Sequence, residues 1–377
     1  MSYVAGGLRE WYYEGVDGTK SVLARLAIIV LGYTGRNTQV KVTFDKEIDV
    51  SKVVKKDKDS GKLVLKLERR AVYLSNHVSH ADWIFMLPFM YLAELENAFY
   101  FYAPKTLFSL PLIGRTLQRF GFVSAGDSKG DKSKAGDALW QLGRRSTKHN
   151  RNIGFVYFPD AALDAARVGG ESKDMNEMIS SSSPKQQALL YTLRTLKLNT
   201  PDLALYDITI GYSTPPQTDT GSNPYLFGAL ASLRHPPETI HIHIRKIEFD
   251  SIPIGEIKSA DKIEAKDRLD AVELDEQVTD DDRRAFKDWL QERWTEKHAR
   301  LDEFYKNGKQ FVVQEGEDVV TQQRSFKVEL RSFDDRLSIF GSYAAFYASV
   351  RIGRRLIRAA PGWTVALVAL AKRKLGA

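Results

Sequence analysis

Segments with the pattern of β-strands alternate with segments long enough for α-helices through the middle of this chain. Strands that alternate with helices are typical of α/β proteins, in which helices cover a sheet that contains parallel strands. We therefore predict an α/β fold with a mixed, largely parallel sheet flanked by helices. The predicted strands are Val64–Ser75, Ala98–Tyr102, Ile153–Phe158, Asp202–Tyr212 and Thr239–Phe249, and the helices between them are Asp82–Glu96, Lys134–Arg145 and Pro184–Leu198.

The predicted sheet occupies the middle of a chain that we divide into four parts. Residues 1–45 are expected to form an N-terminal membrane-contact segment, and residues 46–255 the α/β domain. Residues 256–330 are predicted to combine an acidic linker with a long helix that packs on that domain. Residues 331–377 are basic and apolar, and we expect a second membrane-contact segment there.

The long helix has a predicted start and a predicted buried face. Thr279 and Asp282 have the spacing of a capping pair, in which each side chain binds the backbone of the other residue. Phe286, Leu290 and Trp294 then recur at helical spacing. The pattern therefore indicates a helix that begins at Thr279 and buries this apolar face.

Two terminal regions favour contact with a lipid surface. Val22–Tyr33 is apolar except for Arg25, but a helix needs roughly 20 apolar residues to span a bilayer, so this run suits an interfacial segment, a re-entrant segment or a core helix. Glu10 and Glu14 precede it, which is unlike a cleavable signal peptide. At the other end, basic residues of Arg351–Arg358 and Lys372–Lys374 flank apolar runs, which is typical of an interfacial anchor and is also compatible with a solvated tail.

Overall charge and cysteine content limit the possible functions. The net charge of +7 favours an anionic partner, which could be a phospholipid surface, a phosphorylated substrate or nucleic acid. The nucleic-acid hypothesis rests on charge alone, and we expect no nucleic-acid partner. The chain has 0 cysteines, which excludes disulfides, thiolate metal sites and a cysteine nucleophile.

A histidine and an aspartate lie on either side of the predicted turn between a strand and a helix. His77 and Asp82 are separated by four residues in the stretch Ser75–Trp83. A carboxylate bound to one imidazole nitrogen fixes the tautomer and lets the other nitrogen accept a proton. The pair would thus supply a base without a protein nucleophile, and a substrate hydroxyl would attack. In the alternative interpretation, Ser79 and Asp82 only cap the helix.

Other candidate sites are weaker. His241 and His243 lie two residues apart on one predicted strand and could bind a metal, but no third ligand is evident, so we predict no metal site. No glycine-rich phosphate loop with the Gly-Lys-Ser/Thr ending is present. The aromatic run Phe99–Tyr102 could stack on bases, but its place beside an apolar helix favours core or lipid contact.

The stretch around His77 resembles the first motif of the glycerophospholipid acyltransferase family, which is a histidine, four residues and an aspartate. The Asn-His and Asp-Trp context is similar to the branch that acts on lysophosphatidate, lysocardiolipin and lysophosphatidylinositol. The resemblance extends over about Val64 to Phe304. Its further segments are Lys105–Gly114, Tyr206–Tyr212, Ile240–Arg245 and the helix with Trp289, Glu292 and Trp294.

This resemblance implies a glycerolphosphate acyltransferase-like fold and a reaction. His77, oriented by Asp82, would deprotonate the free hydroxyl of a lysophospholipid, and that hydroxyl would attack the thioester of acyl-CoA. Lys105 matches a lysine that faces the phosphate of the acceptor, where it would act as a point charge. The family uses no metal, no covalent enzyme intermediate and no cofactor besides acyl-CoA as co-substrate. It also implies an intracellular membrane location, most plausibly the endoplasmic reticulum.

The chain departs from the family in two motifs. The second motif should end in an arginine, which Gly121–Asp127 lacks. The third should read Phe-Pro-Glu-Gly-Thr, whereas the chain has Phe158-Pro-Asp160-Ala-Ala. Asp160 is therefore the predicted substrate-binding counterpart of the family glutamate, and Arg115 and Arg119 are candidates to replace the missing arginine. These departures leave open a second hypothesis, in which the protein is catalytically silent and binds lipid or acts as a scaffold.

Overall fold

The protein is described by a computed structural model. It describes residues 2–34, 38–79, 81–125, 129–158, 184–214, 233–257, 278–312, 314–315, 318–319, 322–341 and 351. Residues 1–329 form one compact unit, and residues 330–377 form a second. The two units are described separately below.

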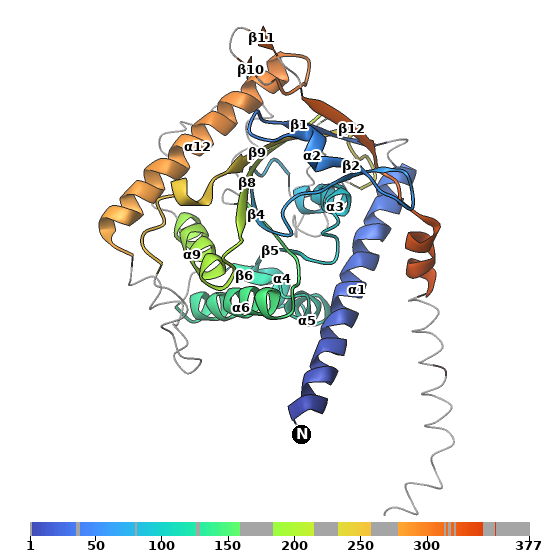
Figure 1. The fold of residues 1–377 in the computed structure, drawn as a ribbon, viewed down its shortest axis with the longest axis vertical. Helices are drawn as coiled ribbons and strands as arrows, with labels where there is room; N and C mark the ends of the chain where they lie inside the picture. The colour runs from blue at the N-terminus through green and yellow to red at the C-terminus, as the bar shows by residue number, and fades with distance from the viewer. Residues whose placement is uncertain are drawn as a thin grey trace, which may run out of the picture. The chain divides into compact units, whose positions relative to one another are not determined.

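The first unit is built on an eight-stranded sheet with the strand order β12-β1-β9-β8-β4-β7-β5-β6 (Figure 1). Parallel pairing joins β1 to β9 and continues from β8 through β4, β7 and β5 to β6, whereas β12–β1 and β9–β8 are antiparallel. The predicted α/β fold with a mixed, largely parallel sheet is therefore confirmed. The strands are β1 (Gln39–Phe44), β4 (Arg70–Ser75), β5 (Phe99–Pro104), β6 (Val123–Ala125), β7 (Ile153–Tyr157), β8 (Ala204–Tyr212), β9 (Thr239–Ile247) and β12 (Gln323–Lys327).

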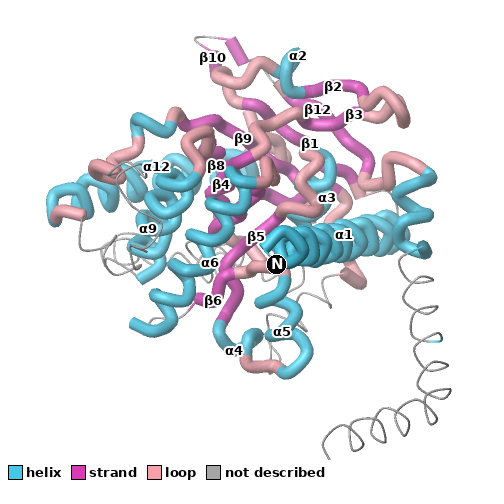
Figure 2. The backbone as a smooth tube through the Cα atoms, turned by 60° about the horizontal axis from the view of Figure 1, so that its bottom comes forward, coloured by secondary structure: helices cyan, strands magenta, loops and turns pink. Residues whose placement is uncertain are grey.

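Helices cover both sides of this sheet (Figures 1 and 2). The N-terminal helix α1 packs against α3 on one side, and α6 packs against α9 on the other. The helix α12 contacts β8 and α9 on the same side as α6. Their bounds are α1 (Ser2–Thr34), α3 (Asp82–Leu92), α4 (Lys105–Phe108), α5 (Pro111–Arg119), α6 (Lys129–Lys148), α9 (Pro184–Asn199) and α12 (Asp280–Lys306).

Short elements complete the unit. The helix α2 (Val50–Val53) leads into the hairpin of β2 (Val54–Lys56) and β3 (Leu63–Leu65), which is separate from the main sheet. A second small hairpin joins β10 (Gln314–Glu315) to β11 (Asp318–Val319). The 3₁₀ turn η2 (Phe249–Ser251) follows β9.

Several elements have different boundaries from those predicted; for example, the helix expected over Lys134–Arg145 begins earlier, at Lys129, and ends at Lys148. The strand expected over Val64–Ser75 is two strands, β3 and β4, because the charged stretch 66–69 leaves the sheet between them. The helix expected over Asp82–Glu96 ends at Leu92, and Glu94 then adopts a left-handed conformation with φ of 58°. That backbone geometry is incompatible with a continuing right-handed helix.

The long helix α12 begins where the capping pair predicts. Thr279 Oγ1 accepts a hydrogen bond from the Asp282 amide, and the Asp282 carboxylate accepts one from the Thr279 amide, so the capping box is complete. Phe286, Leu290 and Trp294 are buried. These contacts attach α12 to the first unit, and the acidic stretch before it lies largely outside the described residues.

The second unit is described only over residues 330–341 and 351. Residues 333–341 are helical, and Ser332 Oγ accepts a hydrogen bond from the Asp335 amide at the start of this helix. Most of the predicted membrane-contact segment 331–377 therefore lies outside the described residues. Within the described parts of both units, no helix combines the length and the apolar character that crossing a membrane requires.

Candidate active site

The parallel strands bring several loops to one edge of the sheet. Ser75 at the end of β4 pairs with Ile208 of β8, and Leu74 pairs with Tyr157 at the end of β7. Segments that follow parallel strands leave the sheet at the same carboxyl edge, where open α/β sheets usually bind ligands. The loop after β4 contains His77, and it therefore lies at this edge.

This loop is fastened to the neighbouring strand β8 by Asn76. The Asn76 side-chain amide donates to the Ile210 carbonyl at 3.0 Å, and its oxygen accepts from the Ile210 amide at 2.7 Å. Asn76 is fully buried, so both bonds form away from water. This two-point contact fixes the backbone immediately before His77.

His77 and Asp82 form a close pair across the loop, as predicted. His77 Nδ1 lies 2.8 Å from Asp82 Oδ2, and the Asp82 side chain is fully buried whereas the His77 side chain is 10% exposed. With Nδ1–H donated to the carboxylate, Nε2 carries the lone pair of the ring. The arrangement is that of a base held by an orienting acid.

Asp82 is also held by three further donors. Its Oδ2 accepts from the amides of Val78 at 2.6 Å and Ser79 at 2.9 Å, and its Oδ1 accepts from the Tyr212 hydroxyl at 2.5 Å. Asp82 is the first residue of α3, whose N-cap position is held by Ala81 without a side-chain cap bond. The Asp82 carboxylate therefore binds the backbone of the preceding loop and the imidazole instead of capping the helix. The alternative that Asp82 is only a helix cap does not account for its contact with His77.

Tyr212 was not among the predicted site residues, although it ends a segment that carries the family resemblance. It is fully buried at the end of β8, and its ring packs edge-on against Phe85 of α3. Burial, reinforced by the Asp82 carboxylate, holds the pKa of Tyr212 well above its ordinary value. The phenol consequently stays protonated and remains a hydrogen-bond donor to Asp82 at all ordinary pH values.

A buried lysine from α12 supports the same edge. Lys297 Nζ donates to the carbonyls of Leu74 at 3.2 Å and Ile208 at 2.5 Å and forms an ion pair with Asp207. Burial lowers the pKa of Lys297 to about 8, although Asp207 opposes this shift. For Asp207, burial raises the pKa, but the nearby cations, Lys297 first, outweigh it and leave the value at about 2. Lys297 thus joins α12 to β4 just before the loop that carries His77.

The third motif of the family follows β7 at the same edge. Phe158 comes directly after β7, and its ring centroid lies 4.9 Å from that of His77. This contact places the start of the altered motif beside the imidazole. The predicted substrate-binding residue Asp160 lies outside the described residues.

The predicted phosphate-binding cations lie in different places. Lys105 follows β5 at the carboxyl edge, where its Nζ is 2.7 Å from Asp131 Oδ2. Arg115 is exposed on α5. Arg119, at the end of α5, lines a pocket together with Tyr100 and Arg151, which lie near the starts of β5 and β7. The structure therefore places Arg119 near the amino edge of the sheet, on the side away from His77.

The histidines that were considered as metal ligands face aromatic rings. The ring of His241 lies 5.0 Å from Phe304, and that of His243 lies 5.9 Å from Phe311. Burial lowers the pKa of His241 to about 4 and that of His243 well below its ordinary value. In the parts of the chain that the structure describes, no three His, Cys, Asp or Glu side chains are grouped as a metal site would require.

Comparison with known proteins identifies acyltransferases as relatives of this chain. Residues 51–173 match the sequence model of the acyltransferase family. The chain is 23% identical to the 2-acyl-1-lysophosphatidylinositol acyltransferase of Saccharomyces cerevisiae over 64% of its own length and 63% of that protein. It is also 23% identical to an uncharacterized acyltransferase of Schizosaccharomyces pombe, over 80% of this chain and 77% of that one. Lysocardiolipin acyltransferase 1 of Gallus gallus is again 23% identical, over 64% of this chain and 56% of that protein.

The matched residues include the whole strand, loop and helix that carry His77 and Asp82, so the family match and the geometry concern the same site. The chain is therefore similar to acyltransferases over residues 51–173, and two of its relatives are named for acyl transfer to lysophosphatidylinositol and lysocardiolipin. It covers less than two thirds of the length of the S. cerevisiae and G. gallus relatives.

Proposed function

We propose that the protein transfers the acyl group of an acyl-CoA to the free hydroxyl of a lysophospholipid, with His77 as the general base and Asp82 as its orienting acid. The observation that carries this proposal is the 2.8 Å contact between His77 Nδ1 and Asp82 Oδ2 at the carboxyl edge of the sheet. Two relatives are named for acyl transfer to lysophospholipids that differ in headgroup, which supports the substrate class but does not choose the headgroup.

The reaction follows from the tautomer that Asp82 imposes. His77 Nε2 takes the proton of the acceptor hydroxyl as the oxygen attacks the thioester carbonyl, and a C–O bond forms. The tetrahedral intermediate then collapses, the C–S bond breaks, and the imidazolium returns its proton to the CoA thiolate. The buried Asp82 carboxylate stabilises the positive charge that His77 carries between these two steps.

We also propose that the protein works at an intracellular membrane surface, in agreement with the endoplasmic reticulum location expected from the resemblance. The outward side of α1 supports this, because Leu23, Leu26, Val30 and Tyr33 recur there at helical spacing and are 38%, 41%, 38% and 87% exposed. An exposed apolar stripe on an amphipathic helix suits the lipid interface. The insoluble acyl acceptor would be available at the same surface.

The test is acyl transfer by the purified chain. The parent, His77→Ala and the control His235→Ala would each be incubated with labelled acyl-CoA and a panel of lysophospholipids that differ in headgroup. His235 is exposed and lies outside the site, so it controls for the loss of an imidazole. We expect the parent and His235→Ala to form labelled diacyl phospholipid, and we expect His77→Ala to lose at least about 10³-fold in rate.

The same samples distinguish the second hypothesis. If the parent binds liposomes but forms no product with any acceptor, the protein is a silent, lipid-binding member of the family. If His77→Ala retains the parental rate, the enzyme uses another base and the proposal is wrong. Circular dichroism of each variant would show that lost activity is not lost folding.

A further inference from the structure

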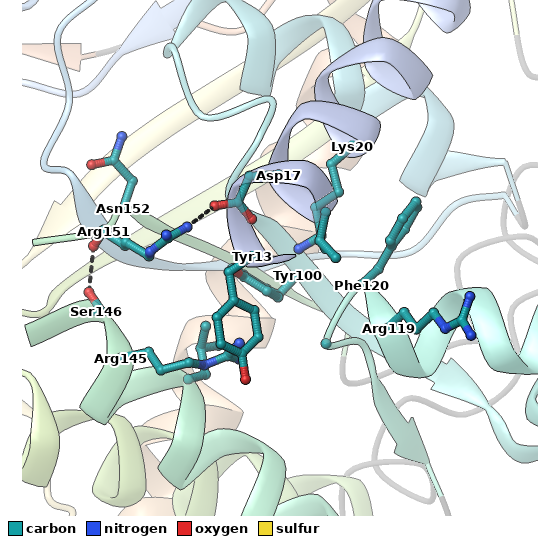
Figure 3. A pocket seen from close by; sticks show the side chains of 13 residues that line it. Tyr13, Asp17, Lys20, Tyr100, Arg119, Phe120, Arg145, Ser146, Arg151 and Asn152 are labelled. Atoms are coloured by element: carbon teal, nitrogen blue, oxygen red, sulfur yellow. Dashed lines mark hydrogen bonds and ion pairs between the residues drawn. The ribbon is translucent and has the colours of Figure 1, made fainter. Parts of the chain in front are cut away.

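A polar pocket lies near the amino edge of the sheet. It is bounded by α1, the start of β5, the residues before β7 and the last turns of α6, and Figure 3 shows its side chains. The empty space among these side chains, counted together with the open mouth, is about 380 Å³. Neither His77 nor Asp82 lines it, so it is separate from the proposed active site.

Ion pairs beside the pocket connect α1 to the residue before β7. Arg151, just before β7, lies 2.5 Å from Asp17 of α1 (Figure 3). It also lies 3.1 Å from Glu10 of the same helix. Asp17 is the only acidic residue among the side chains that line the pocket. The two nearby carboxylates are therefore already engaged by Arg151.

The pocket contains two further arginines, Arg145 and Arg119, that take no part in these ion pairs. Arg145 lies with its guanidinium carbon 4.4 Å above the ring of Tyr13, and its Nε donates to the Gln141 carbonyl. Arg119 stands at the rim of the group in Figure 3. Over the described ranges of the chain, neither arginine has a carboxylate within 4.0 Å. The pocket thus has an excess of positive charge.

Lys20 is the most unusual member of the group. Its side chain is fully buried, and among the described residues its only hydrogen-bond acceptor is the Phe99 carbonyl, at 3.3 Å. The amine lies 3.5 Å from the centre of the Tyr100 ring. In its charged form the amine would have three N–H donors, and two of them would find no hydrogen-bond acceptor in the described parts of the chain, although the Tyr100 ring lies beside them. A buried donor without an acceptor costs free energy that a bound anion would recover.

We propose that this pocket binds a phosphate-type oxyanion between Lys20 and Arg145. A phosphate dianion would offset the excess charge, and its oxygens would accept hydrogen bonds from the arginine fork and from the buried amine. The same chemistry is available from a soluble phosphate ester and from the headgroup of a phospholipid.

Binding should be linked to proton uptake. Burial holds the pKa of Lys20 well below its usual value; Asp17 opposes this shift and Arg145 adds to it. An anion beside the amine favours its charged form, so the complex takes up a proton where the free pocket holds neutral Lys20. The other charged or titratable groups that line the pocket are Tyr13 and Asp17 on α1, Tyr100 on β5, Arg119 on α5, Arg145 on α6 and Arg151 before β7.

The experiment is calorimetric titration of the full chain with inorganic phosphate at constant ionic strength, in two buffers of different ionisation enthalpy. We expect saturable binding with a buffer-dependent heat that reports proton uptake. Arg145→Gln should weaken binding at least tenfold. Arg144→Gln, which removes the same charge from an exposed neighbour that does not line the pocket, should change it less than twofold. No saturable binding by the parent, or equal weakening by both variants, would overturn the proposal.

A second arm identifies the source of the phosphate. Phosphatidylcholine vesicles with and without phosphatidate would be mixed with the parent and with Arg145→Gln. A phosphatidate preference that Arg145→Gln abolishes assigns the pocket to a lipid headgroup. Equal vesicle binding by both proteins, together with binding of free phosphate that depends on Arg145, assigns it to a soluble ester. Because neither arm measures acyl transfer, the inference can fail or succeed independently of the proposed reaction.

Discussion

Among the single residues of this protein, Asp82 has the most demanding environment. It is fully buried and accepts hydrogen bonds from an imidazole, two backbone amides and a phenol. A buried carboxylate costs several kcal/mol unless it is fully hydrogen-bonded. The four donors meet this requirement and also fix which way the carboxylate faces, which in turn fixes the ring of His77.

The first prediction concerns the Tyr212 phenol. Tyr212→Phe removes one donor from the buried Asp82 carboxylate, so we expect the free energy of unfolding to fall by about 1.5–3 kcal/mol. A looser carboxylate should lower kcat roughly tenfold, which corresponds to about 1.4 kcal/mol, with little change in KM. Steady-state kinetics and urea denaturation would measure the two effects.

The matched control for this change is Tyr73→Phe. Tyr73 is also fully buried, but its hydroxyl has no hydrogen-bond partner among the residues that the structure describes. Loss of that hydroxyl should leave kcat unchanged and should not reduce stability. An equal loss of kcat in both variants would contradict the role given to Tyr212.

The second prediction concerns the pH dependence of stability. The pKa of His241 is lowered to about 4 in the folded chain, by burial first and then by Lys41 and Lys309, whereas an unfolded histidine titrates near 6.5. Between these values the unfolded chain binds more protons, so stability falls as pH decreases from 6.5 towards 4. The slope from this group is at most about 1.4 kcal/mol per pH unit. The free energy of unfolding of the parent and of His241→Gln would be measured by denaturation at several pH values. Plotted against pH, the free energy of the parent should fall more steeply between pH 6.5 and 4 than that of His241→Gln. Parallel plots for the two proteins would contradict this prediction.

At the scale of helices and strands, α12 stabilises the edge of the sheet that carries the proposed active site. Its residue Lys297 reaches the carbonyls of Leu74 and Ile208 and the carboxylate of Asp207, on two neighbouring strands. Those strands carry His77 and Tyr212 at their ends. The helix therefore stabilises the relative position of the two strands whose side chains meet at Asp82.

The third prediction follows from this connection. Lys297→Met keeps the apolar stem but leaves Asp207 buried with Arg245 as its remaining salt bridge. Breaking a buried pair in this way usually costs about 3–5 kcal/mol, and we expect a loss of stability in that range. Lys306→Met, on an exposed position of the same helix, should cost less than about 0.5 kcal/mol. Urea denaturation of both variants measures the difference, and similar midpoints would contradict the structural role of Lys297.

At the scale of the whole molecule, the fourth prediction concerns the lipid surface. Leu26→Glu places a charge in the exposed apolar stripe of α1, so we expect weaker co-sedimentation with anionic liposomes. Gln118→Glu adds the same charge on an exposed position of α5 and serves as the control. An equal effect of both changes would indicate simple charge repulsion instead of contact through α1.

The sequence was sufficient for the fold class, for the central strands and for the local half of the site, whereas the outer strands β1, β6 and β12 were not predicted. Alternation of strands and helices predicted the α/β architecture, and the pair His77–Asp82 was recognisable because only five positions separate its members. Tyr212 and Lys297 were missed because their partners are distant in the sequence. Tyr212 lies 130 residues from Asp82, and Lys297 lies 90 residues from Asp207. Such contacts depend on the order of strands in the sheet, which local patterns do not determine.

The central claim is that His77 and Asp82 act as one unit in acyl transfer. The most direct test is a double-mutant cycle on kcat/KM, with His77→Ala, Asp82→Ala and both changes together, against acyl-CoA and the best acceptor. If the two residues act together, the double variant will be about as slow as His77→Ala alone, because Asp82 works through the imidazole. Losses that simply multiply, or a His77→Ala variant as fast as the parent, would contradict the account.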